Sequence, residues 1–210
     1  MKSKSPLIDV LRKSNQQAAT KGNLLSEITH RCSWVNPENP RYVTYHDCEW
    51  GTPCHDDRAL FELLVLEGFQ AGLSWEGILN KREAFRSAFD SFDPLVVAEY
   101  DDSKIAELMA NSAIVRNRRK IEAAIGNARA FMQIQAEFGS FDAYLWAFVD
   151  GKPVAEDCSN HTTSSLGNRV SNDLKRRGFK FVGPVITYSF LQATGIICGH
   201  ERGCDLCALT

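Results

Sequence analysis

The sequence predicts an all-α fold, and three observations support this class. From Asp56 onward, apolar residues recur at helical spacing through most of the chain. Residues that favour helix N-termini precede these segments, and glycines follow several of them. No segment shows a sustained alternation of apolar and polar residues bounded by turns, as a half-buried strand would. With 210 residues, 44% of them hydrophobic, the chain can form one domain or two small lobes around a sizeable core.

The first part of the chain carries the weakest structural signal. Residues 1–30 hold one short helix candidate, "PLIDVLRKS", followed by the polar stretch "NQQAATKGN", so we expect a weakly ordered N-terminal extension. The helical domain is then expected to span residues 31–210. Residues 41–51, "RYVTYHDCEWG", indicate a loop that is unusually rich in aromatic and potential metal-ligating side chains.

The next segments predict four helices with recognisable starts. The first begins at Asp56 or Asp57 and is ended by a Gly-Leu pair. The second follows Ser74 and continues through Phe89. A third opens at the dipeptide 93–94, where an aspartate cap precedes a proline at the first helical position, and a fourth covers about residues 102–109. One side of the first helix carries Leu60, Phe61, Leu64 and Glu67.

The second half predicts one long helix and three shorter ones. The long helix follows a tight turn near residues 111–115 and ends at Gly139. Ser140 can cap a helix over residues 141–149. A polar loop over residues 151–168 precedes a short basic helix that ends at Gly178, and an apolar helix then ends at Gly195.

Composition argues against a membrane span and a secretory start but leaves DNA binding open. No apolar run approaches the roughly 18 residues that a span needs, and the first residues lack the apolar core of a signal sequence, so we expect a cytoplasmic protein. The net charge is −2, yet residues 111–210 hold 12 Lys and Arg against 9 Asp and Glu. A polyanion needs only a local basic face.

The seven cysteines indicate free thiols or a metal site, because an odd count without a signal sequence argues against a disulfide framework. Two potential ligands, Cys32 and His46, lie near the start of the domain, and two more, His200 and Cys204, lie near its end. Together they would form a Cys₂His₂ zinc site that restrains both ends, with a structural role since no position is left for water.

Two alternatives to this zinc site stay open. The thiols can be scattered and unrelated, or Cys204 and Cys207 can form a redox pair. Asp47 is a poor companion for thiolates in such a site. The remaining cysteines are expected to be ordinary packing or surface thiols: Cys48, Cys54, Cys158 and Cys198.

A second set of residues predicts a binding pocket. Glu67 lies in an apolar helical turn, Gln70 shares its face, and Trp75 follows after a glycine-containing turn. A carboxylate on an apolar face is costly unless it is paired or used. Aromatic planes and an acid suit a flat, nitrogen-rich ligand, and the further candidates are Trp34, Tyr42 and Tyr45. The alternative, and from the residues alone the more common case, is a Glu67–arginine salt bridge beside core aromatics.

Basic residues cluster at two places. Arg116, Arg118, Arg119 and Lys120 lie at the start of the long helix, where positive charge opposes the helix dipole unless an anion docks there. The stretch "KRRGFK", which includes Lys175 and Arg176, forms the second cluster. Both suit phosphate contacts, although a solvated charged helix face explains them equally well.

Four blocks of the sequence together resemble the 3-methyladenine DNA glycosylase I family. They are "RCSW…YVTYHDCEWG", "LFELLVLEGFQAGLSW", "IVRNRRKIEAAIGNARA" and "KRRGFKFVGPVITYSFLQATG". The resemblance extends from about Arg31 to Cys204. It implies a two-lobed helix-hairpin-helix fold and a monomeric protein without a membrane partner. It also implies an enzyme that flips 3-methyladenine out of alkylated double-stranded DNA, hydrolyses its N-glycosidic bond and releases the free base.

The resemblance also assigns residues to roles. It implies zinc ligands at Cys32, His46, His200 and Cys204. Glu67 and Tyr45 correspond to the groups that bind the modified base, and Trp75 to the residue that stacks on it. Gly72 and Leu73 would abut the gap left by the flipped nucleotide, and the basic clusters would contact DNA. Further pocket lining is expected from Tyr42, Trp34 and Gln70.

Two departures and two rival functions remain. Ala113 stands where the family commonly has a glycine in the hairpin turn, so the turn must avoid positive φ or accept strain. No aspartate follows the hairpin before Asp142, which casts Glu67 as a recognition group in a monofunctional enzyme. One rival is a glycosylase/lyase that uses Lys120 as a Schiff-base lysine. The other is a non-catalytic, zinc-clipped DNA-binding module.

Overall fold

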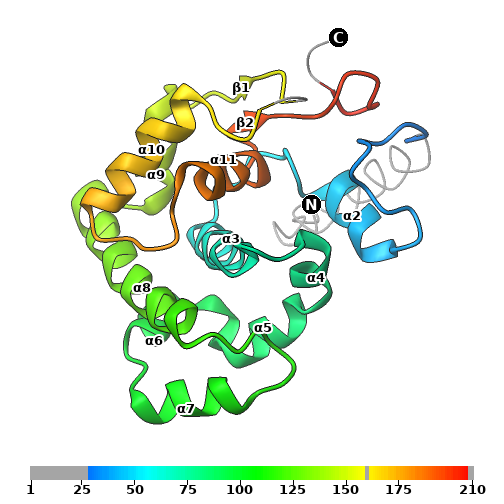
Figure 1. The fold of residues 1–210 in the computed structure, drawn as a ribbon. Helices are drawn as coiled ribbons and strands as arrows, with labels where there is room; N and C mark the ends of the chain where they lie inside the picture. The colour runs from blue at the N-terminus through cyan, green and yellow to red at the C-terminus, as the bar shows by residue number, and fades with distance from the viewer. Residues whose placement is uncertain (1–27, 159–160, 208–210) are drawn as a thin grey trace, which may run out of the picture.

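Helices carry nearly all of the regular structure in residues 28–158 and 161–207, which are the residues that the computed structural model describes (Figure 1). The prediction of a mostly helical protein is confirmed. Of the expected N-terminal extension, residues 1–27 lie outside the described residues. The helices are α2 (Pro40–Cys48), α3 (Asp57–Gln70), α4 (Trp75–Asn80), α5 (Arg82–Ala88), α6 (Pro94–Ala98), α7 (Asp102–Ala110), α8 (Arg118–Phe138), α9 (Phe141–Trp146), α10 (Ser165–Arg176) and α11 (Pro184–Ala193), with 3-10 turns η1 (Asp90–Phe92) and η2 (Ala147–Val149).

One small sheet departs from the all-α expectation. Strands β1 (Val154–Ala155) and β2 (Ile197–Cys198) pair in parallel, with Val154 opposite Ile197. Two residues per strand are too few to produce an alternating pattern, so the sequence carried no signal for them. The pairing brings the loop before α10 beside the segment that follows α11 (Figure 1).

Most helix starts were predictable because a side chain satisfies the free amide groups there. Asp56 accepts a hydrogen bond from the Ala59 amide at the start of α3, and Ser74 accepts one from the Gly77 amide at the start of α4. Asp93 with Pro94 opens α6, and Ser140 caps α9. Glycine marks one helix end in a similar way: Gly139, which follows α8, adopts a φ of 88°, which an L-residue rarely does.

Four boundaries differ from the prediction. Residues 40–48 form α2 rather than a loop, because Asn39 accepts from the Arg41 amide and Pro40 occupies the first turn. The helix expected through Phe89 breaks at Lys81 into α4 and α5. Helix α8 begins at Arg118, since Asn117 caps it. Helix α10 begins at residue 165, inside the expected loop.

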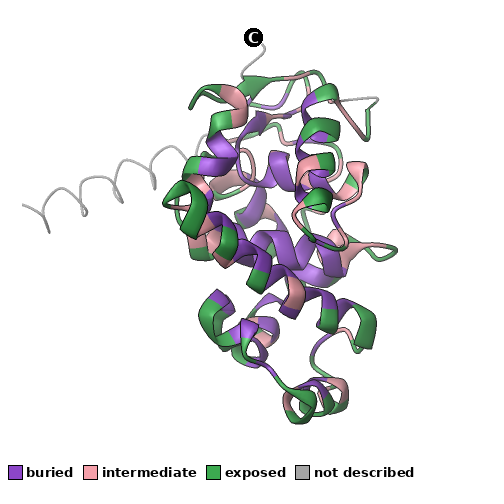
Figure 2. Cartoon of the chain, turned by 90° about the vertical axis from the view of Figure 1, so that its left-hand side faces the viewer, coloured by how far each residue is buried: buried purple, intermediate pink, exposed green. Residues whose placement is uncertain are grey.

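Helix α3 lies at the centre of the molecule, with α8, α9 and α11 packed against it (Figure 1). All ten residues from Leu60 to Phe69 are buried, so the helix is covered on every side rather than on the single stripe that the sequence indicated. Figure 2 shows the same trend for the whole body, with buried residues inside and exposed residues along the outer helix faces. Two of the ten buried residues are carboxylic acids, Glu62 and Glu67.

The pair α7–α8 forms a helical hairpin whose turn contains Ala113. Ala113 is not among the positive-φ residues of the described chain, so the turn avoids the conformation that would have strained an alanine. The Asn111 side chain accepts from the Ala113 amide at 2.9 Å, and Lys81 Nζ donates to the Ala113 carbonyl at 3.2 Å. The hairpin is thus tied to the junction between α4 and α5.

Among the described residues, none of the helices has the length and apolar character needed to cross a membrane.

Candidate active site and metal cluster

A cavity of about 150 Å³ lies beside the last two turns of α3. All six residues predicted to form a ligand pocket line it. They come from α2, α3, α4 and the segment before α2, and are Trp34, Tyr42, Tyr45, Glu67, Gln70 and Trp75. The structure therefore brings together residues that are up to 41 positions apart in the sequence.

Three further lining residues were missed. Trp50 was interpreted as packing, and Ser189 and Gln192 lie on α11, which the sequence presented only as an apolar helix. Their spacing of three places both on one helix face. Two polar residues on one face of an otherwise apolar helix were the signal that could have revealed them.

Glu67 is buried, with 4% of its surface exposed, and the described residues offer it neither a hydrogen bond nor an ion pair. Burial alone raises its pKa to about 8. The expected alternative, a salt bridge to a neighbouring arginine, is wrong, because Arg82 and Arg86 pair with Glu62 instead. Glu67 is left facing the cavity as a proton-binding group.

Two more buried polar atoms of this cavity have no hydrogen-bond partner within the described chain. They are the Tyr45 hydroxyl and Trp75 Nε1. The two rings lie with centroids 5.4 Å apart. Burial and the nearby Glu67 carboxylate raise the pKa of Tyr45 well above its usual value, so its hydroxyl remains a donor. Buried polar groups are normally satisfied, and their convergence here indicates a ligand that supplies the missing partners.

The four predicted metal ligands form a second buried group. One donor atom from each of Cys32, His46, His200 and Cys204 lies within 4.8 Å of all the others. Cys32 Sγ is 3.5 Å from His200 Nδ1, and Cys204 Sγ is 3.6 Å from both His46 Nε2 and His200 Nδ1. In a tetrahedral zinc site, neighbouring donor atoms lie about 3.5 Å apart, so the donor set of two sulfurs and two nitrogens and the three short distances fit zinc.

The surroundings of this cluster orient its histidines. His46 Nδ1 lies 2.7 Å from Asp47 Oδ1, and Arg31 donates to both oxygens of the same carboxylate. Asp47, set aside as a ligand, thus fixes the His46 ring with Nε2 toward the cluster. His200 lies against Gly51, where an added Cβ would stand 2.9 Å from His200 Nε2, so only glycine leaves room.

The alternative of a Cys204–Cys207 redox pair differs from the arrangement observed. Cys204 belongs to the four-residue cluster, whereas the Cys207 thiol donates to the His200 carbonyl at 3.3 Å. None of the seven cysteines, all of which lie within the described residues, forms a disulfide.

Helix α2 joins the cluster and the cavity. Tyr42 and Tyr45, three residues apart, face the cavity, while His46 faces the cluster. Two tryptophans lie between the two sites: the Trp34 ring is 5.2 Å from that of His46, and Trp50 is 4.7 Å from His200. Fixing the ends of the domain at the cluster therefore fixes one wall of the cavity.

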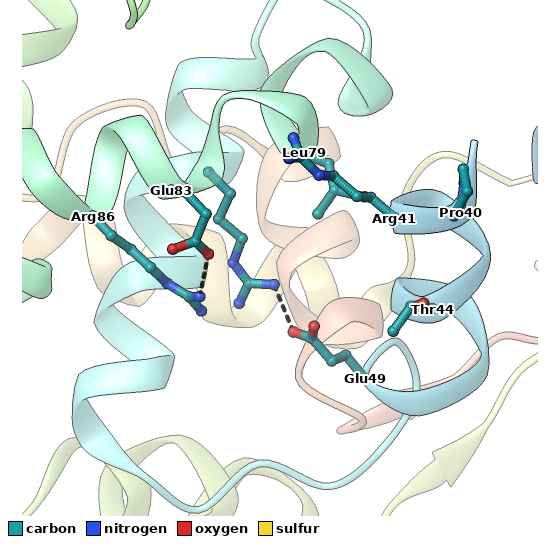
Figure 3. Close-up of a pocket in the computed structure, with 8 residues that line it drawn as sticks. Pro40, Arg41, Thr44, Glu49, Leu79, Glu83 and Arg86 are labelled. Carbon is teal, nitrogen blue, oxygen red and sulfur yellow. Dashed lines mark hydrogen bonds and ion pairs between the residues drawn. The ribbon is translucent and has the colours of Figure 1, made fainter. Parts of the chain in front are cut away.

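A larger cavity, of about 300 Å³, lies on the other side of α2 (Figure 3). Its charged side chains are engaged with each other: Arg86 pairs with Glu83, and Arg82 pairs with Glu49. The remaining lining comes from Pro40, Arg41, Thr44 and Leu79. The acids and the two arginines of α5 neutralise one another, and this network ties the end of α2 to α5. Arg41 instead donates to the Asn80 carbonyl at 3.1 Å.

The residues predicted to contact DNA are placed differently from one another. Gly72 has a φ of 79° and open space around it, and Leu73 is 46% exposed. Arg116, Arg118 and Arg119 are exposed around the start of α8, as are Lys175 and Arg176 at the end of α10. Phosphate contact by these exposed residues stays a prediction.

Lys120 is the exception. It is buried, and its Nζ donates to the carbonyl oxygens of Phe69 at 2.8 Å and Ala71 at 2.7 Å. The phosphate contact expected of Lys120 is therefore not supported, because its ammonium points inward to the end of α3. The Schiff-base role meets the same obstacle. The reason is helical phase, since Lys120 shares a face with Ala124 and Ala128, whereas Arg118 and Arg119 point outward.

Buried acid, aromatic walls and unsatisfied donors around a small cavity define a protein that binds a flat heterocycle inside a helical body. Comparison with known proteins makes this class specific. The methyladenine glycosylase family matches residues 34–208, and the chain belongs to this family. DNA-3-methyladenine glycosylase 1 of Escherichia coli K12 is 44% identical over 178 residues, which cover 83% of this chain and 95% of that protein.

Solved structures agree in fold. A crystal structure of a 3-methyladenine DNA glycosylase I has a TM-score of 0.80 and 43% identity, covering 84% of this chain and 98% of that one. The 3-methyladenine DNA glycosylase I of Staphylococcus aureus, described for its recognition of 3-methyladenine, has a TM-score of 0.80 and 40% identity, covering 84% and 95% of the two chains.

Proposed function

We propose that the protein is a monofunctional DNA glycosylase that excises 3-methyladenine from alkylated double-stranded DNA. The observation that carries this proposal is Glu67, which is buried without a partner among the described residues in a cavity that Tyr45 and Trp75 also line and that is sized for a small heterocycle. The relatives that match the chain over most of its length bear the name of this activity. Base flipping would bring the lesion from the duplex into the cavity.

Glu67 acts in this mechanism through charge recognition. Methylation at N3 leaves the adenine cationic within DNA, so its glycosidic bond is already weak. The cationic base lowers the pKa of Glu67 and favours the carboxylate, which accepts a hydrogen bond from the base edge. The glycosidic bond then breaks with attack of water on the sugar; its electron pair leaves with the base as neutral 3-methyladenine, and the water's proton passes to solvent.

The aromatic residues hold the base in position. The Tyr45 hydroxyl, which has no partner in the described chain, donates to an acceptor on the base. Trp75 stacks on the ring, and a positive ring gains cation–π attraction that an unmodified adenine lacks. Discrimination against normal adenine therefore depends on charge as well as shape.

We also propose that Cys32, His46, His200 and Cys204 hold a structural Zn²⁺. The donor set and the spacing of its atoms support this proposal. Four protein ligands leave no position for a water nucleophile, so the ion would stabilise the protein rather than take part in hydrolysis. Elemental analysis of natively purified protein should find one zinc per chain, and Cys204→Ser should lose it with a lower midpoint of thermal unfolding. Metal-free protein of unchanged stability would contradict the proposal.

The hairpin α7–α8 suits the DNA-binding element of a two-lobed helix-hairpin-helix glycosylase. Arg116, Arg118 and Arg119 would contact phosphates beside it, and Gly72 and Leu73 would approach the gap left by the flipped base. The engaged Lys120 argues against a lyase mechanism. A non-catalytic DNA-binding module would not need an unpaired acid among aromatic residues.

Release of base from DNA tests the central proposal. Purified protein incubated with methylnitrosourea-treated duplex DNA should release 3-methyladenine, which chromatography separates from 7-methylguanine. Borohydride should trap no covalent adduct between the protein and the DNA. Absence of base release would leave the non-catalytic module as the better description, and a trapped adduct would indicate the lyase.

A further inference from the structure

The side chain of Lys120 occupies an unusual position for a member of a basic cluster. Only 7% of the residue is exposed, and two of its three N–H donors reach the carbonyl oxygens of Phe69 in α3 and of Ala71, which follows α3. The Phe181 ring lies 5.9 Å from Nζ and covers it. A buried ammonium is costly unless its hydrogen bonds are made, so an apolar side chain would pack at this position at a lower desolvation cost.

The carbonyl groups that Lys120 binds belong to the end of α3. The last carbonyls of a helix lack partners within the helix, and the residue that follows α3, Ala71, does not turn back to satisfy them. The chain instead turns tightly: the Leu73 amide donates to the Gln70 carbonyl at 2.6 Å, and Gly72 takes a positive φ. Lys120 supplies the cation that a helix C-terminus favours.

This turn connects residues of the base-binding pocket with a residue expected to approach the DNA. Glu67 precedes it by one helical turn, and Trp75 follows it at the start of α4. At its tip is Leu73, a large apolar side chain that is 46% exposed. Gln70 Nε2 donates to the Leu73 carbonyl at 2.9 Å, so the turn is braced from within as well.

The other end of Lys120 belongs to the hairpin. The Lys120 backbone amide donates to Asn117 Oδ1, the helix cap, at 3.2 Å. Arg118 and Arg119, which precede Lys120, are exposed. A second lysine makes a parallel link, since Lys81 Nζ binds the Ala113 carbonyl in the hairpin turn. One residue thus joins the basic start of α8 to the turn that holds Leu73.

We infer that Lys120 is a positioning residue that couples the seating of the hairpin on DNA to the placement of the Ala71–Leu73 turn, and so assists extrusion of the base from a duplex. The inference rests on the proposed glycosylase function. Lys120 touches neither the base nor a phosphate in this role. Its loss should weaken the step that needs Leu73 at the duplex, while the pocket made by Glu67, Tyr45 and Trp75 keeps its affinity for a free base.

The test compares three substrates of Lys120→Met: alkylated duplex DNA, the same DNA denatured to single strands, and free 3-methyladenine. Single-turnover excision from the duplex should fall about 10–100-fold, as misplacement of a supporting element does. Excision from single strands and binding of the free base should change less than about threefold. Leu73→Ala should show the same preference, and adding Lys120→Met to it should cost little more, because both act through one turn.

Arg129→Met is the matched control. Arg129 lies on the same helix and also donates to a carbonyl at the end of another helix, that of Ala98 in α6, at 2.9 Å. It should lower the unfolding midpoint without changing the ratio of duplex to single-strand excision. Lys120→Gln, which keeps one donor group, serves as the second variant if Lys120→Met does not fold.

Three results would overturn the inference while leaving base release by the unaltered protein intact. A smaller salt dependence of DNA affinity, by about one phosphate, would make Lys120 a direct contact. An equal loss on all three substrates would make it a part of the fold only. Full duplex activity in a folded Lys120→Met or Lys120→Gln would show that the turn needs no support. If the unaltered protein released no base, the proposed function would fail first.

Discussion

Two buried glutamates on one helix have opposite surroundings. Glu62 and Glu67 lie five positions apart on α3 and are 6% and 4% exposed. Arg82 Nε lies 2.5 Å from Glu62 and Arg86 Nε 2.9 Å from it, so that charge is paired. Glu67 has no such partner among the residues that the structure describes, and burial raises its pKa to about 8. A buried acid is therefore not a sign of function in itself; the missing partner is.

The largest effect is expected at the paired acid. Glu62→Gln leaves two guanidinium groups beside a neutral side chain, and breaking a buried pair in this way costs about 3 kcal/mol of unfolding free energy. Arg82 keeps Glu49, which limits the loss. Urea denaturation measures it. Excision by the folded fraction should stay close to that of the unaltered protein, and a large activity loss without a stability loss would reverse the comparison.

Glu67→Gln should show the opposite pattern. The amide is nearly isosteric with the acid but cannot carry the negative charge that favours the cationic base, so single-turnover excision should fall about 100-fold, or about 2.7 kcal/mol. The fold should survive, because no contact within the described chain is broken. Unchanged excision would remove Glu67 from the mechanism.

The raised pKa of Glu67 also predicts a pH dependence of stability. In the folded state the group binds its proton up to about pH 8, whereas the unfolded group releases it near its ordinary pKa of 4.5. The unfolded state thus binds fewer protons between these values, and stability falls as pH rises through this window. Relative to Glu67→Gln, the protein should lose on the order of 3 kcal/mol between pH 5 and pH 8.

The matched experiment repeats this pH series with Glu62→Gln. Glu62→Gln serves there as a control for the removal of a buried acid from the same helix, at a site where the acid is paired. Parallel curves for the unaltered protein and Glu67→Gln across that range would mean that Glu67 is ionised and stabilised in the folded protein by a partner.

Helix caps and costly side chains made much of this arrangement predictable. Asp56 and Ser74 mark the starts of α3 and α4, because the free amide groups at a helix N-terminus need acceptors. Such capping depends only on neighbouring residues, so the sequence reveals it. The two sites could be anticipated because a carboxylate in an apolar turn and paired Cys/His residues at both ends of a domain need an explanation.

What the sequence did not reveal depends on direction and on distant contacts. Lys120 belongs to a basic cluster by composition, yet helical phase turns it inward to carbonyls some 50 residues away. Helix α2 was interpreted as a loop because its ligand-bearing side chains outweighed a clear Asn39–Pro40 start. Which buried glutamate pairs with Arg82 could not be told from spacing, since both lie on the same helix.

The smallest effect separates the aromatic wall from the acid. Trp75→Ala removes a stacking surface but leaves Glu67 and Tyr45 in place, so excision should fall only about tenfold, in line with one cation–π contact. Trp75→Phe should recover part of the loss, because a smaller ring attracts a cation less strongly. If the loss equalled that of Glu67→Gln, the acid would act mainly by holding the stacked base in place, and charge recognition would be the lesser part of the mechanism. Comparing the loss of excision from alkylated DNA with the loss of affinity for free 3-methyladenine in both variants decides between these, since charge recognition acts on the cationic base within DNA but not on the neutral released base.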